Sequence, residues 1–133
     1  MDLEKFTNVD APCFYLAVSD ESQFTDWQML LERTFPDAVV RAIRGKKSTT
    51  VADFFDEVGE AWQLPYYFGE NWNVFNDCMT DLEWLPGRMY LMLVRDASSL
   101  LQGADQEDFA ILMRILQQTQ EAWKTPNRYF PRD

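Results

Sequence analysis

Short apolar runs alternate with amphipathic segments along this chain, and this alternation restricts the fold more than any other feature. Branched and aromatic side chains are concentrated, as in β-strands, at residues 13–18, 38–43 and 88–94. Apolar residues recur at helical spacing in residues 22–35, 50–64, 70–82 and 106–123. The order β-α-β-α-α-β-α predicts an α/β fold with a small, mainly parallel sheet of about three to four strands packed with helices.

The last of these helices is the longest, and its pattern predicts which residues enter the core. The side chains expected on its inner side are Phe109, Leu112, Met113, Leu116 and Trp123. Two placements remain open for the segment after it, residues 125–133, which either pairs as a short last strand or packs without pairing. A chain of 133 residues fits one domain spanning residues 1–133.

The charge balance restricts the class of partner. The chain has 22 acidic and 12 basic residues and a formal net charge of −10. Such a field repels nucleic-acid phosphates, and it attracts and steers cationic proteins. We therefore expect a basic protein partner and no direct contact with nucleic acid.

Several kinds of chemistry are excluded by residue types that the chain lacks. It contains no histidine, which excludes Ser-His-Asp triads, Cys-His pairs and zinc sites that need imidazole. The two cysteines, Cys13 and Cys78, do not form a CxxC motif. Free thiols are the simpler interpretation, although sequence alone leaves a disulfide open. We expect no metal, no cofactor and no catalytic residue.

The N-terminal residues and the hydropathy of the chain predict where the protein resides. Residues 1–5 are acidic and lack the basic and then apolar pattern of a signal peptide. No apolar run approaches the roughly 20 residues that a membrane span needs. These features predict a soluble, cytoplasmic protein that does not contact membranes.

The helix predicted over residues 70–82 divides into two opposite faces at about 100° per residue. The apolar face, expected in the core, consists of Trp72, Phe75, Met79 and Leu82. The polar face consists of Glu70, Asn73, Asp77 and Asp81, with Asn76 and Thr80 beside them. No basic residue occurs between Gly69 and Gly87 to neutralise these carboxylates. The polar face is either a solvated acidic surface or a recognition surface.

The loop before this helix favours recognition. Tyr66, Tyr67 and Phe68 stand in a row before Gly69, and at most two of the three rings can point inward comfortably. An aromatic ring left beside an acidic patch is a candidate anchor for a protein partner. Aromatic, glycine, amide and carboxylate groups together indicate a patch that recognises a basic protein surface.

Residues 64–80, LPYYFGENWNVFNDCMT, resemble the signature of the barstar family, intracellular inhibitors of barnase-type ribonucleases. The Tyr-x-Gly-Glu-Asn core, the Asp-Cys pair and the following Thr all fall in register. The resemblance is good over residues 39–94 and looser in the helix after residue 106. It implies a barstar-like α/β fold in which residues 38–124 form the family core, 1–37 are an N-terminal β-α addition and 125–133 are a tail.

The resemblance also implies a function, that of an immunity protein which is not itself an enzyme. In the family, this loop and helix plug the active site of a secreted or toxin ribonuclease, and a carboxylate matching Asp77 takes the place of a substrate phosphate. The residues expected to bind the partner are Tyr67, Gly69, Asn71, Asn73, Asn76, Asp77, Thr80 and Asp81.

Three positions depart from the family pattern. Asn73 replaces a carboxylate, Asn76 replaces an aromatic residue, and Asp81-Leu82 stand where Gly-Trp is usual. Because a specific interface discriminates between partners through such details, the alternative is a barstar-like binding module with a different, non-ribonuclease partner.

Other charged residues have less specific interpretations. Most of an acidic cluster in the helix over residues 50–64 is expected on the solvated face of that helix, and the cluster consists of Asp53, Asp56, Glu57 and Glu60. A basic cluster is expected at a strand-end turn and consists of Arg41, Arg44, Lys46 and Lys47. Glu70 and Asp77 are seven residues apart, about 10 Å along a helix, which is long for a pair of hydrolytic carboxylates.

Overall fold

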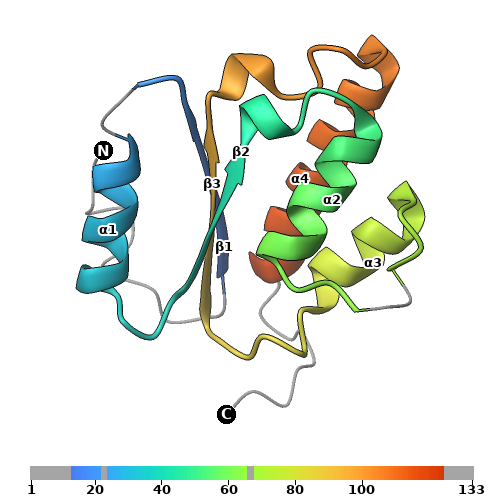
Figure 1. Ribbon diagram of the computed structural model, residues 1–133. Helices are drawn as coiled ribbons and strands as arrows, with labels where there is room; N and C mark the ends of the chain where they lie inside the picture. Colours follow the sequence, from blue (N-terminus) through green and yellow to red (C-terminus); the bar gives the residue numbers. More distant parts are fainter. Residues whose placement is uncertain (1–12, 22–23, 66–67, 125–133) are drawn as a thin grey trace.

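The computed structural model describes residues 13–21, 24–65 and 68–124, and Figure 1 shows their arrangement. The main elements are β1 (Cys13–Ser19), α1 (Phe24–Thr34), β2 (Val39–Arg44), α2 (Val51–Ala61), α3 (Trp72–Asp81), β3 (Met89–Arg95) and α4 (Gln106–Lys124). Short 3₁₀ helices follow two strands, η2 (Gly45–Lys47) after β2 and η4 (Ala97–Ser99) after β3. The predicted α/β class and element order are confirmed. The predicted tail, 125–133, lies outside the described residues.

A three-stranded parallel sheet lies at the centre of the described residues, in the order β1-β3-β2. The central strand β3 aligns Met89 with Cys13 of β1, and Tyr90 with Val39 of β2. Residues 89–94 are all buried, which explains why this strand is the most continuously apolar run in the chain. The expected parallel pairing is confirmed.

The two faces of the sheet are covered by different helices, as Figure 1 shows. Helix α1 covers one face, where Phe24 and Leu31 pack with Leu91 and Leu93 of β3. Helices α2, α3 and α4 cover the other face. There, alternate residues of β3, Tyr90 and its same-side neighbours, join a larger core. None of the described helices is long and apolar enough to cross a lipid bilayer.

Helix α4 corrects part of the predicted core. Leu112, Leu116 and Trp123 are buried as expected, but Phe109 is 40% exposed and Met113 is only partly buried. At 100° per residue, Phe109 and Met113 both lie on the same margin of the stripe of buried residues. The periodicity identified the helix, but it extended the buried stripe too far toward that margin.

The turn after β2 contains a glycine in a position that no larger residue could occupy. A side chain at Gly45 would collide with the backbone oxygens of Arg95 and Asp96. This close approach lets the ends of the neighbouring strands β2 and β3 pack directly against each other.

Candidate functional site: the exposed side of α3

Helix α3 begins two residues later than the sequence predicts. Gly69 and Glu70 both have left-handed backbone conformations, with φ of 64° and 49°, so neither can extend the helix. Asn71 is instead the N-cap, and its side-chain Oδ1 accepts a hydrogen bond from the backbone N–H of Val74 at 2.9 Å. Glu70, expected on the polar face of the helix, is therefore an exposed loop residue.

The aromatic loop before α3 is only partly described. Phe68 points inward, is 6% exposed and packs edge-to-face on Phe55 of α2, with ring centroids 5.3 Å apart. Tyr66 and the predicted partner-binding Tyr67 lie outside the described residues. Phe68 is thus one of the rings, at most two in number, that were expected to point inward.

The inner side of α3 matches the predicted apolar face. Phe75, Met79 and Leu82 are fully buried, and Trp72 is partly buried against Phe54 and Phe55. Cys78 is also buried, and burial raises the pKa of its thiol to about 11. Both cysteines are free thiols in the structure, as the simpler interpretation held. Burial of these side chains fixes which side of α3 faces solvent.

The outer side of α3 carries the polar residues predicted for recognition. Asn73 and Asp77 are exposed, whereas Asn76, Thr80 and Asp81 are partly exposed. The hydroxyl of Thr80 donates to the backbone carbonyls of Asn76 at 3.0 Å and Asp77 at 3.1 Å. Its hydrogen is thus used within the helix, and its oxygen can still accept.

One polar atom on this side has no partner among the described residues. The Oδ1 atom of Asn76 is buried and accepts no hydrogen bond from them. A buried amide oxygen without a donor costs stability, and such atoms are infrequent in native structures. Asn76 is therefore the least satisfied polar group of the predicted site.

Two tryptophan N–H groups fix α3 against α4. The indole of Trp72 donates to Asp108 Oδ1 at 3.3 Å, and the indole of Trp123 donates to the backbone carbonyl of Met79 at 3.0 Å. Sequence reasoning missed Asp108, which resembles any other carboxylate in the first turn of a helix. These two bonds hold the exposed side of α3 in a defined orientation.

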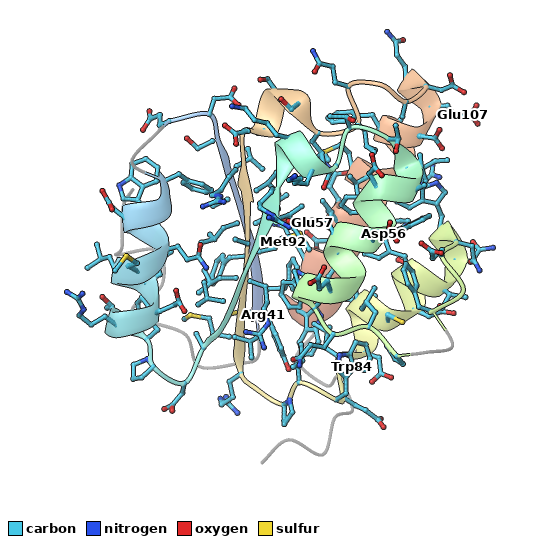
Figure 2. All side chains as sticks on the ribbon, viewed as in Figure 1. Arg41, Asp56, Glu57, Trp84, Met92 and Glu107 are labelled. Atoms are coloured by element: carbon cyan, nitrogen blue, oxygen red, sulfur yellow. The ribbon has the colours of Figure 1, made fainter. Side chains whose placement is uncertain are left out.

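Most of the second acidic cluster is solvated, as predicted, and Glu57 is the exception. Glu57 is 7% exposed and accepts three hydrogen bonds from Arg44, one from its backbone N–H and two from its guanidinium. Figure 2 shows Glu57 on the side of α2 that faces β2 and Asp56 on the opposite side. The hydrogen bonds from Arg44 hold the pKa of the Glu57 carboxyl below its usual value. Asp53, Asp56 and Glu60 are exposed, as expected.

The basic cluster has the structural role expected of a strand-end turn. Arg44 ends β2 and Lys46 lies in the following 3₁₀ helix, 4.0 Å from a carboxylate oxygen of Asp96. Within residues 13–21, 24–65 and 68–124, no group of three or more carboxylate or thiol side chains is placed to hold a metal ion. The exposed side of α3 is thus the strongest candidate site for binding another molecule.

Comparison with known protein families found one family that matches most of the chain. A family model described as barstar (barnase inhibitor) matches residues 38–131, which is more than half of the chain. The match includes β2, α2, α3, β3 and α4, whereas β1 and α1 precede it. No curated protein matches the chain with significance.

Proposed function

The chain belongs to the barstar family, and from that membership we propose that it inhibits a basic, barnase-type ribonuclease. The loop and helix of residues 66–82 enter the nuclease active site and block it stoichiometrically, without catalysing a reaction. One observation carries the proposal: Asn73 and Asp77 are exposed on a helix whose other side is fixed in the core. Such a surface is rigid before it meets its partner, so little ordering entropy is lost on binding.

Asp77 is the centre of the proposed contact. Its carboxylate takes the place of a substrate phosphate among the Arg and Lys side chains of the nuclease. Hydrogen bonds between a guanidinium or ammonium and a carboxylate are about twice as strong as neutral ones. The absence of basic residues between Gly69 and Gly87 leaves this carboxylate without a cation nearby in sequence.

The remaining predicted residues surround this contact. Gly69 and Asn71 lie where the loop joins α3, and Tyr67 contributes its ring from the loop. The outer side of the helix adds Asn73, Asn76, Thr80 and Asp81. The side-chain oxygens of Asn73, Thr80 and Asp81 accept hydrogen bonds from a cationic surface. The net charge of −10 accelerates the approach of a basic nuclease.

The direct test is inhibition of a purified barnase-type ribonuclease by increasing amounts of the protein. We expect activity to fall to zero at a 1:1 ratio. Asp77→Ala should weaken binding at least about 30-fold, because truncating one member of a desolvated charge pair costs about 2–5 kcal/mol, and barnase–barstar is itself a measured case. Asp56→Ala on α2 and Asp26→Ala on α1 remove the same charge from exposed positions and should change the dissociation constant about twofold or less.

Equal effects of the three substitutions would contradict the assigned surface, and full nuclease activity at excess protein would contradict inhibition. The alternative function is binding of a protein that is not a ribonuclease. The amides of Asn73 and Asn76 favour it, because both replace groups usual in the family. Tight binding to a barnase-type enzyme would eliminate this alternative.

A further inference from the structure

Helix α1 carries an apolar patch on the side that faces away from the sheet. Its inner side chains Phe24 and Leu31 are buried, whereas Met29 is 55% and Leu30 is 42% exposed. Among the described residues, these two are the only exposed large apolar side chains that share an element. Figure 1 shows α1 on the opposite side of the sheet from α2, α3 and α4. Neighbouring exposed apolar side chains on a peripheral helix indicate a surface that binds another protein.

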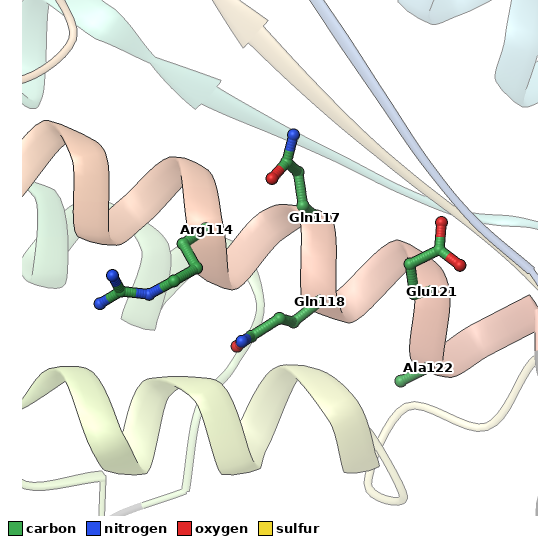
Figure 3. A pocket seen from close by; sticks show the side chains of 5 residues that line it. All are labelled: Arg114, Gln117, Gln118, Glu121 and Ala122. Carbon is green, nitrogen blue, oxygen red and sulfur yellow. The ribbon is translucent and has the colours of Figure 1, made fainter.

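The groove along α4 lacks this apolar character, as Figure 3 shows. It has a volume of about 620 Å³ and is lined by Arg114, Gln117, Gln118, Glu121 and Ala122. Most of these side chains are polar, and they include both a guanidinium and a carboxylate. Burying such groups costs free energy unless each finds a partner. The outer side of α1 is therefore the stronger candidate for a protein contact.

The two apolar side chains of α1 lie between opposite charges. A stripe at spacings i, i+3, i+4 and i+7 runs along the outer side of the helix and consists of Asp26, Met29, Leu30 and Arg33. Asp26 lies in the first turn and Arg33 in the last, where each charge also suits the helix dipole. They are seven residues apart, beyond the spacing of three or four at which side chains pair on one helix. Both are exposed, and neither forms an ion pair with a residue that the structure describes.

This order of groups is complementary to itself when the direction of the helix is reversed. In an antiparallel pair of α1 helices, Asp26 of each copy faces Arg33 of the other copy, and Met29 faces Leu30. A parallel pair would instead place Asp26 opposite Asp26 and Arg33 opposite Arg33, which is repulsive. Because a two-fold axis repeats every antiparallel contact, two ion pairs would flank a shared apolar centre.

We propose that α1 is a self-association surface, on which a second copy of the chain packs its own α1 antiparallel. The inference goes beyond the proposed function and does not depend on it. The net charge of −10 opposes association at long range, but the acidic residues of α2 and α3 lie across the sheet from the contact. A contact made by one helix of 11 residues is small, so the dimer is weak and reversible. The exposed side of α3 stays free in this dimer.

Sedimentation equilibrium of the unmodified chain at about 10 μM to 1 mM tests the proposal. We expect the apparent mass to rise with concentration from that of a monomer toward that of a dimer. Met29→Glu should weaken association at least about tenfold, because it places a carboxylate in the apolar centre of the contact. The matched control is Phe109→Glu on α4, which adds the same charge at an exposed apolar residue outside the contact. It should leave the association unchanged.

A charge exchange tests the antiparallel pairing itself. Asp26→Arg and Arg33→Asp each place like charges opposite each other in a dimer of identical chains, so each variant alone should associate at least about tenfold more weakly. An equimolar mixture of the two variants should associate again, because both pairs in the mixed dimer then join opposite charges. Recovery in the mixture also verifies that both variants are folded.

Other outcomes would overturn the proposal. Long-range repulsion alone predicts tighter association for Asp26→Arg, because this change reduces the net negative charge. Association that Met29→Glu leaves unchanged would place the contact on another surface. A chain that stays monomeric up to about 1 mM would show that another segment of the chain or a different protein covers this side of α1, and not a second copy.

Discussion

The indole N–H of Trp123 donates to the backbone carbonyl of Met79 over 3.0 Å, joining the last helix to the helix of the candidate site. Helix α3 ends at Asp81, so the carbonyl of Met79 is one of the last four that have no partner within the helix. A residue 44 positions away in sequence satisfies it. The orientation of the proposed binding surface therefore depends on a long-range contact.

Trp123→Phe should destabilise the protein by about 2 kcal/mol or more, because it leaves a buried carbonyl without a donor and a gap in the core. Chemical denaturation measures this loss. Trp27→Phe on α1, which is only partly buried, is the control and should cost less. Equal losses would contradict the importance of the Trp123 hydrogen bond.

Asn71→Ala should cost about 1 kcal/mol of stability, because the first turn of α3 loses its cap. Asn71→Asp retains an acceptor at the same position and adds a charge that favours the positive end of the helix. Thermal unfolding of both variants measures what the cap contributes to stability, and it does so without the partner. A loss of stability in Asn71→Asp as large as in Asn71→Ala would contradict the capping role.

The bond between Arg44 and Glu57 predicts how stability depends on pH. The pKa of Glu57 is lowered in the folded protein, so the unfolded chain binds the proton more readily. The contribution of Glu57 is therefore complete above its ordinary pKa of 4.5 and is lost as the pH falls through the lower folded value. Glu57→Gln should flatten this acid dependence in urea denaturation measured across the pH range.

Asp53→Asn is the control for that experiment, since Asp53 is exposed on the same helix and its side chain makes no ion pair among the described residues. The stability of the Asp53→Asn variant should change with falling pH in the same way as that of the unmodified protein. An unchanged acid dependence in Glu57→Gln would contradict the assigned role of the Arg44 pair.

Local sequence patterns were sufficient to predict the helices and strands and the two sides of α3. The periods of 2 residues in strands and 3.6 residues in helices depend only on backbone geometry. The helical period directly predicts the burial of Phe75 and Met79 and the exposure of Asn73 and Asp77. The left-handed conformation of Gly69 is one that glycine adopts readily, but the left-handed Glu70 beside it moved the first residue of the helix to Trp72. The division into residues 1–37, 38–124 and 125–133 and the partner-binding role of the site residues remain predictions.

The sequence by itself determined the α/β class, the parallel sheet and the family, because these depend on patterns within segments and on the order of those segments along the chain. Only the tertiary structure decided that Glu57 is paired with Arg44 rather than solvated, and that Asp108 and Trp123 hold α3. The physical reason is that a carboxylate or an indole has the same local preferences in either environment. Which residue pairs with such a group depends on which side chains come close to it when the sheet and helices pack together.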